Sequence, residues 1–296
     1  GKALGIASGL GLILLPATAL CVTALALSTG EGLLADDPWR VVALGAVYLV
    51  YFAVVVALSL WVSARASSSR LALVVLLTFW FANSVVASRV VSDLAAWLHP
   101  TPSAVEFQKS LEAELNNEKE MQERLDRRRE ELLKQYNVAS VDALPIAFSG
   151  VSLQEGEEHG NEVFDQHFGS LFDQYDRQNR VFQWSALVAP MLATRGLSMG
   201  LSGTDFAQHR HFITAAESYR RDIQRTLNGD IAKNQKAGEV YMAGRELWDQ
   251  VPAFSYDPPP AGWVLGQYSL ALVVLGAWLV ASVALMMRAA TTALVD

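Results

Sequence analysis

The chain has 296 residues, of which 52% are hydrophobic and 18% are charged, below the roughly 25% of charged residues in soluble domains. A net charge of −7 argues against non-specific nucleic-acid binding, and we expect no nucleic-acid partner. The single cysteine, Cys21, excludes a disulfide within the chain, so any water-exposed part must hold together by packing.

Most of the charge lies in one polar block, residues 100–257, and long apolar stretches border it on both sides. A bilayer core about 30 Å thick needs roughly 20 apolar helical residues to cross it. The stretches that meet this criterion lie at about 3–28, 41–64, 71–98 and 263–287. The sequence therefore predicts an all-α membrane protein with four transmembrane helices. Its expected parts are a transmembrane region at 1–99, a mainly helical domain at 100–257, and a last transmembrane helix with a tail at 258–296.

The short loops predict which side of the membrane each segment faces, because Lys and Arg concentrate in short cytoplasmic loops. Arg65 and Arg70 bound one such loop, and Arg288 follows the last apolar stretch. The loop that contains Glu31 is acidic and is expected on the other side. Four crossings make these assignments agree, and they place residues 100–257 outside the cytoplasm.

Within the polar block we expect only helices. Their predicted ranges are Ala104–Tyr136, about 157–182, a helix that starts at Ser202–Asp205 and runs to about Leu227 with Asn228-Gly229 closing it, and Lys236–Trp248. The second of these has an aromatic stripe, Phe164, Phe168 and Phe172, which is typical of a core face but is also a candidate contact surface for an amphipathic substrate.

Residues 184–201 are more apolar than the rest of the block, but Pro190, Gly196 and Gly200 interrupt them. A crossing here would break the predicted orientation. We expect a short helix that is either buried in the outer domain or dips into the outer membrane surface.

Four polar residues lie late in the third apolar stretch and are candidates for a transport pathway: Asn83, Ser84, Arg89 and Asp93. Arg89 and Asp93 are four residues apart, so they share a helix face and can pair. Charges near a membrane are often functional. A structural pair at the outer end of the helix is the alternative.

Motifs for catalysis are missing from the sequence. It contains no P-loop and no nucleophile motif, so we expect that this chain is not an enzyme and binds no ATP through such a loop. His209 and His211 are two residues apart and fall on different helix faces, which suits surface or helix contacts. No histidine or cysteine spacing predicts a metal site.

Several short motifs together carry a resemblance to a known family. They are Ser63-Ala-Arg65, His99-Pro100, Val141–Pro145, Glu157–Asn161, Val163–Asp165, Leu197–Met199, Gly203–Asp205, His209–His211 and Leu227–Asp230. With these residues the chain resembles a bacterial family of type-2 ABC exporter permeases that carry a large extracytoplasmic insert, long labelled a domain of unknown function. The motifs span nearly the whole chain from the second apolar stretch onward.

The resemblance implies a six-helix permease half, of which this chain has the last four helices and the insert between the final two. It implies a second permease subunit, identical or related, and separate cytoplasmic ABC ATPase subunits that bind ATP and Mg²⁺. The ATPase-contacting elements of such permeases would lie upstream of Gly1, and we expect that native sequence is missing there. Membrane lipid and a periplasmic protein are further expected partners, in a bacterial inner membrane.

Two other functions remain open at this point. One is a membrane-anchored sensing or interaction protein whose outer helical domain binds a ligand or partner. The other is a periplasmic metal-dependent enzyme, for which metal analysis of the purified insert is the test. A neighbouring P-loop gene favours transport, whereas a kinase or cyclase partner favours sensing.

Overall fold

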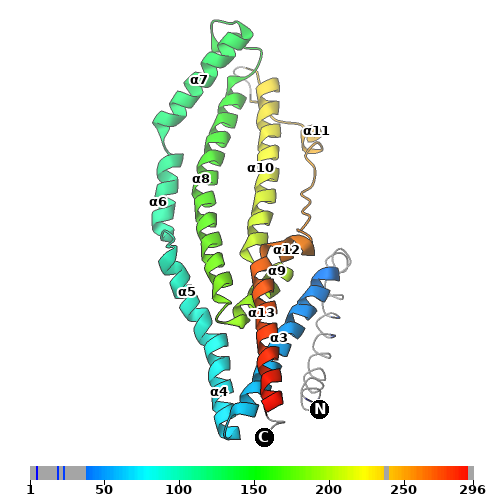
Figure 1. The fold of residues 1–296 in the computed structure, drawn as a ribbon. Coiled ribbons are helices and arrows are strands. Elements are labelled where there is room, and N and C mark those ends of the chain that lie inside the picture. The colour runs from blue at the N-terminus through cyan, green and yellow to red at the C-terminus, as the bar shows by residue number, and fades with distance from the viewer. Residues whose placement is uncertain (1–4, 6–18, 20–22, 24–37, 237–239, 293–296) are drawn as a thin grey trace. The chain divides into compact units, whose positions relative to one another are not determined.

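The computed structural model describes residues 38–236 and 240–292, together with Gly5, Ala19 and Thr23 (Figure 1). The expected first transmembrane segment, 3–28, lies outside the described residues apart from those three positions. Every regular element in the described part is helical, without a strand. The elements are α3 (Pro38–Arg65), α4 (Ser69–Phe81), the π-helix η1 (Ala82–Val86), α5 (Ala87–Leu98), α6 (Ala104–Leu115), α7 (Glu118–Tyr136), the 3₁₀ turn η2 (Val141–Ala143), α8 (Phe148–Ser185), α9 (Pro190–Leu201), α10 (Phe206–Asn234), α11 (Arg245–Trp248), α12 (Ala261–Gln267) and α13 (Ser269–Thr292).

Among the described residues, three helices are long and apolar enough to cross a membrane, as in a membrane protein. They are Trp39–Arg65, the continuous α4–η1–α5 rod Ser69–Leu98, and Ser269–Thr291. The helices expected at 41–64 and 71–98 are confirmed. The last one begins later than expected, because Tyr268 ends α12 and separates it from α13.

The chain divides into two compact units. Unit 1 comprises residues 1–99, 176–209 and 258–296, and unit 2 comprises residues 100–175 and 210–257. The domain expected at 100–257 therefore differs from unit 2 in its middle, because residues 176–209 pack with the candidate spans.

Unit 1 has a continuous apolar core in which α9 packs against α3, α12 and α13. Small residues permit this close packing. A Cβ at Gly200 would lie 2.6 Å from the Tyr268 ring, and one at Gly196 would lie 3.2 Å from it. The short helix expected within residues 184–201 is therefore present as α9, but it is buried in unit 1 among the candidate spans and not in unit 2, where burial in the polar block was expected.

Unit 2 consists of α6, α7, most of α8 and α10, and α11. Its described part buries only three apolar side chains, Leu132, Val163 and Leu247. Two polar side chains of unit 2, His159 and Asn161, are also buried. The backbones of α8 and α10 meet at Gly150, where a Cβ would lie 2.4 Å from the Ala232 nitrogen.

Several predicted boundaries in the polar block are wrong. The single helix expected at Ala104–Tyr136 breaks at Asn116, and the Asn117 side chain caps α7 by accepting from the Glu120 amide, 3.4 Å away. Asparagine competes with the helix for backbone hydrogen bonds and favours such caps. The expected stop at Asn228-Gly229 is absent, because α10 continues to Asn234. In place of a helix at Lys236–Trp248, the described residues form only α11.

Candidate functional site

Asn83 lies in the π-helix η1, halfway along the second candidate span, and its side chain is only 4% exposed. Its amide nitrogen donates to the Tyr51 hydroxyl, 3.4 Å away, and its amide oxygen accepts from the backbone nitrogen of Met191, also 3.4 Å away. One side chain thus joins α4–η1–α5 to α3 and to the first turn of α9. The neighbouring Ser84 is half-buried, and the Ser88 hydroxyl donates to its carbonyl.

Arg89 and Asp93 form the ion pair that their spacing allows, with 3.1 Å between Nε and Oδ2. Their side chains are 80% and 60% exposed in unit 1. The pair is therefore local to α5, and the structure does not bring it together with Asn83.

A second polar cluster in unit 1 surrounds Arg40, which is buried near the start of α3. Its guanidinium donates to the Leu201 carbonyl over 3.2 Å, to the Gln208 side-chain oxygen over 3.1 Å, and to the Pro259 carbonyl. This charge caps the carboxyl end of α9, where a cation is favoured by the helix dipole. Sequence reasoning missed Arg40, although a charge two residues after the helix-starting Pro38 was a visible signal.

Asp205 and Tyr268 extend this cluster. The Tyr268 hydroxyl donates to one Asp205 carboxylate oxygen over 2.8 Å, and the Gln208 amide donates to the other over 3.1 Å. Asp205 also accepts from the Gln208 backbone nitrogen and so caps α10. Buried acceptors and donors from four segments are thereby paired, as buried polar groups require.

The aromatic residues proposed as outer-domain contacts form one row along α8. Phe164 and Phe168 are stacked with centroids 5.4 Å apart, and Phe172 lies 6.0 Å further on. Phe107 of α6 meets Phe168 edge-on at 5.0 Å. Phe164 is 40% exposed, so the row is partly a packing face towards α6 and partly open.

The two histidines proposed with them lie in different environments. His209 belongs to unit 1, is exposed, and has the ring of Phe206 6.5 Å away. His211 belongs to unit 2 and its Nδ1 lies 3.0 Å from the Tyr256 hydroxyl. The two histidines thus belong to different units.

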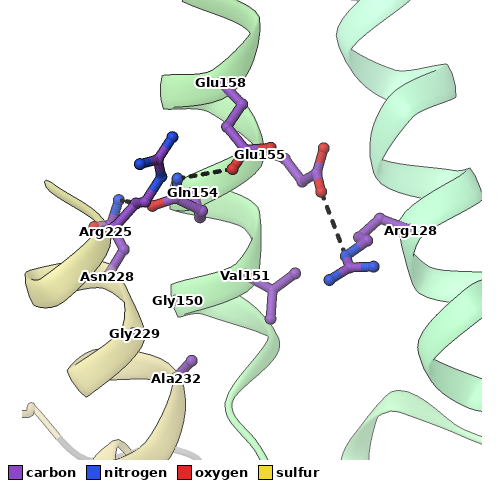
Figure 2. A pocket seen from close by; sticks show the side chains of 10 residues that line it. All are labelled: Arg128, Gly150, Val151, Gln154, Glu155, Glu158, Arg225, Asn228, Gly229 and Ala232. Carbon is purple, nitrogen blue, oxygen red and sulfur yellow. Dashed lines mark hydrogen bonds and ion pairs between the residues drawn. The ribbon is translucent and has the colours of Figure 1, made fainter. Parts of the chain in front are cut away.

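A cavity of about 430 Å³ in unit 2 is lined by residues of α7, α8 and α10. Figure 2 shows the side chains that line this cavity. Charges of both signs line it: Arg128 and Arg225 against Glu155 and Glu158. Arg128 lies 3.4 Å from Glu155. Burial raises the pKa of the Glu155 carboxyl, and the negative charge of Glu158 adds to this, while Arg128 opposes it. The complete lining is Arg128, Gly150, Val151, Gln154, Glu155, Glu158, Arg225, Asn228, Gly229 and Ala232.

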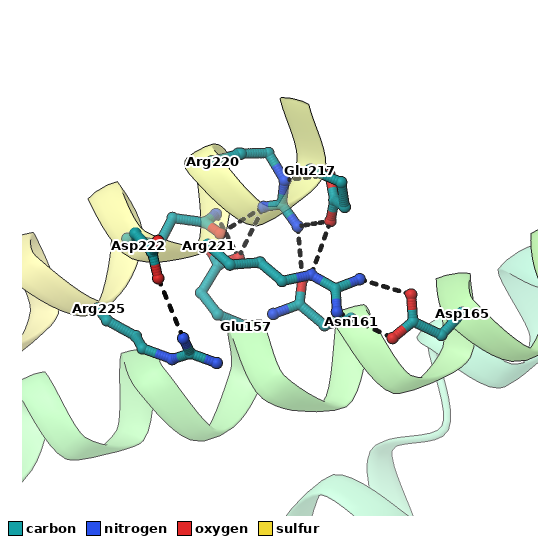
Figure 3. A network of polar contacts seen from close by, with 9 residues as sticks. Glu157, Asn161, Asp165, Glu217, Arg220, Arg221, Asp222 and Arg225 are labelled. Atoms are coloured by element: carbon teal, nitrogen blue, oxygen red, sulfur yellow. Dashed lines mark hydrogen bonds and ion pairs between the residues drawn. The ribbon is translucent and has the colours of Figure 1, made fainter. Parts of the chain in front are cut away.

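A polar network joins α8 to α10 beside this cavity (Figure 3). Arg221 donates to both carboxylate oxygens of Asp165, over 2.9 and 2.6 Å. Arg220 donates to Glu217 and to Asn161. The hydrogen bond from Arg220 lowers the pKa of the Glu217 carboxyl. These contacts fix the register of two helices that bury little apolar surface between them.

Another interhelical pair joins α7 to α8. Arg124 donates to both oxygens of Glu162, over 2.8 and 3.0 Å, and this lowers the pKa of the Glu162 carboxyl. Neither residue of this pair was singled out from the sequence. Among the described residues, no three His, Cys, Asp or Glu side chains gather in a way that could hold a metal ion.

Comparison with known proteins gives one match, which covers the polar block. No curated protein and no solved structure matches the chain. The family model described as "Domain of unknown function (DUF3526)" matches residues 104–257, which is more than half of the 296 residues. The chain therefore belongs to the DUF3526 family.

Proposed function

We propose that the chain is the transmembrane permease subunit of an ATP-driven ABC transporter of the exporter type, in a bacterial inner membrane. In this proposal the spans of unit 1 flank the transport path and unit 2 lies on the periplasmic side. ATP and Mg²⁺ bind to separate cytoplasmic subunits, and a second permease subunit, identical or related, completes the path.

The observation that carries this proposal is the buried Asn83 inside an apolar span. Polar side chains within membrane spans are costly and concentrate along substrate pathways. The π-helix that presents Asn83 is a geometry found frequently at functional sites. Asn83 also contacts α9, so a shift of α9 would change the packing at the middle of two spans. The motif resemblance to type-2 ABC permeases supports the same function.

In this proposal unit 2 caps or gates the outer end of the path or docks a periplasmic partner. Its helices are bridged mainly by long charged side chains, and few apolar side chains are buried there. Regions with few buried apolar contacts open at low free-energy cost, which suits an element that moves during transport.

The test is purification of the tagged chain from its native host in mild detergent, with mass-spectrometric identification of everything that co-purifies. We expect a P-loop ATPase in stoichiometric amount and ATP hydrolysis by the complex. Asn83→Ala should keep the ATPase bound but lower ATP turnover in reconstituted vesicles. Ser92→Ala, an exposed position on the same span, is the matched control and should leave turnover unchanged. A complex without any ATPase contradicts the proposal.

A membrane-anchored sensor is the second candidate function, and the cavity in Figure 2 favours it. About 430 Å³ suits a small ligand, and a lining with charges of both signs fits one that carries both a cationic and an anionic group. Co-purification of a kinase or cyclase in place of an ATPase would support this function.

A further inference from the structure

The turn between α8 and α9, residues 186–189, lies inside unit 1 among the candidate spans. Ala186 is fully buried, and Trp278 of α13 donates from Nε1 to its carbonyl over 3.2 Å. Two residues beyond the turn, the backbone amide of Met191 donates to Asn83. A segment of the polar block is therefore anchored by hydrogen bonds to two different candidate spans.

The anchoring residues lie near the middle of their spans. Asn83 is the fifteenth of 30 residues in Ser69–Leu98, and Trp278 is the tenth of 23 in Ser269–Thr291. Tyr51, which pairs with Asn83, is the thirteenth of 27 in its own span. At about 1.5 Å per residue, each lies within about 3 Å of its helix midpoint. In a hydrocarbon core about 30 Å thick, that is close to the centre.

The backbone of this segment is suited to such a depth. Non-helical backbone at membrane depth is tolerated only where its polar groups are paired inside the protein. The amides of residues 186–189 donate to carbonyls of residues 183–185, and Pro190 has no amide hydrogen. Met191 donates to Asn83, and Leu192 donates to the Ala189 carbonyl. Every amide from 186 to 192 is thus accounted for.

The outer side of the turn is apolar and uncovered within the described chain. Trp184 and Leu187 are exposed, and Val188 is 82% exposed. Residues 181–194 contain no Asp, Glu, Lys or Arg. A charge-free turn with large exposed apolar side chains at its tip fits lipid hydrocarbon rather than water.

We propose that residues 182–201 form a re-entrant hairpin whose tip lies near the middle of the bilayer, with Trp184, Leu187 and Val188 against lipid acyl chains. The hairpin does not depend on transport. It requires only that α3, α4–η1–α5 and α13 cross the membrane, so it holds equally for a sensor.

The test uses nitroxide labels on single cysteines in the full chain, with Cys21→Ser as background, in phosphatidylcholine vesicles. Val188→Cys is the test position and Leu187→Cys is its repeat at the neighbouring residue. Val280→Cys, 70% exposed at the middle of α13, is the lipid control, and Val240→Cys, 91% exposed in unit 2, is the water control. We measure collision with oxygen and with a neutral, water-soluble nickel complex.

Labels at 187 and 188 should match the label at 280, with an oxygen-to-nickel collision ratio several-fold above that at 240. Nickel access at 187 and 188 equal to that at 240 would overturn the hairpin. Shielding from both reagents would also overturn it, because it would place protein rather than lipid at the tip. If the nickel complex reaches the label at 280, α13 does not lie in the membrane, and the hairpin proposal is then wrong as well. These collision measurements do not involve an ATPase partner. If no ATPase co-purifies, the proposed transport function fails but the hairpin can still be confirmed.

Discussion

The helices of unit 1 pack through buried apolar side chains and small residues, whereas those of unit 2 are joined mostly by long charged side chains. In unit 1, α9 lies so close to Tyr268 that Gly200 leaves no room for a side chain. In unit 2, Arg124 reaches Glu162 on α8, and Arg221 of α10 reaches Asp165 on the same helix.

The two units should therefore respond to different perturbations. A close-packed interior is sensitive to volume and to unpaired buried groups. Exposed ion pairs are individually weak and depend on pH and salt. Variants that change packing should therefore damage unit 1, and acid should loosen unit 2.

The largest effect is expected from Arg40→Leu. The change removes the donor to the Leu201 and Pro259 carbonyls and to Gln208, and each buried acceptor left unpaired costs about 1–3 kcal/mol. Thermal unfolding of the full chain in detergent micelles should show a loss of more than about 3 kcal/mol. Arg70→Leu, at an exposed position, is the control and should change little. Equal effects of the two variants would contradict the assigned role of Arg40.

Gly200→Leu should have a smaller but clear effect on unit 1. Its Cβ would lie 2.6 Å from the Tyr268 ring and 2.9 Å from Val264, and overpacking of this kind costs about 1–3 kcal/mol. Gly276→Leu is the matched control on α13, because no atom lies within 4 Å of a Cβ there. The same unfolding measurement applies, and a Gly276 variant as unstable as the Gly200 variant would argue against close packing of α9.

Acid should destabilise unit 2, and the loss for each ion pair should be smaller than the losses expected from the two substitutions in unit 1. The folded-state pKa values of Glu162 and Glu217 are lowered, so their stabilisation is complete above the unfolded value of about 4.3 and is lost as the pH falls through the lowered values. Because these pairs are partly exposed, we expect at most about 1 kcal/mol from each. Circular dichroism of urea unfolding between pH 7 and pH 3 measures the loss.

A variant of Glu217 separates the contribution of one carboxylate from the general effect of acid. Glu217→Gln should be less stable than wild type at pH 7, and the difference should shrink as the pH falls, because protonation removes the carboxylate that the variant lacks. Glu123→Gln, an exposed position on α7, should follow the wild-type profile throughout. Unfolding that is independent of pH in both variants and wild type would show that the charge network contributes nothing.

The helices themselves could be predicted from apolar periodicity, and so could the candidate position of Asn83. The ends of the helices were harder to predict, because a side chain that can cap a helix competes with the backbone hydrogen bonds that would continue it. Asn117 starts a new helix inside a run without Gly or Pro, and Gly229 sits inside α10 rather than at its end. Gly229 lines the cavity of Figure 2 with open space beside it, so no contact there required the helix to stop.

Contacts between helices could not be predicted from periodicity, because the sequence does not state which helices are neighbours. The pairing of Arg124 with Glu162 and the contact of Asn83 with Met191 both depend on tertiary arrangement. Gly196 and Gly200 carried a usable signal: two glycines four residues apart mark a face for close helix packing. Taken as interruptions, they concealed the place of α9 in the core.

The proposed permease requires unit 2 to lie outside the cytoplasm, and labelling of single cysteines from either side of the membrane measures this. In the Cys21→Ser background, Ser140→Cys places a thiol at an exposed position of unit 2, and Ser67→Cys places one in the loop between α3 and α4. A membrane-impermeant maleimide added to intact cells should label position 140, and it should label position 67 only after lysis. Labelling of position 140 only after lysis would contradict an outer domain carried by a membrane permease.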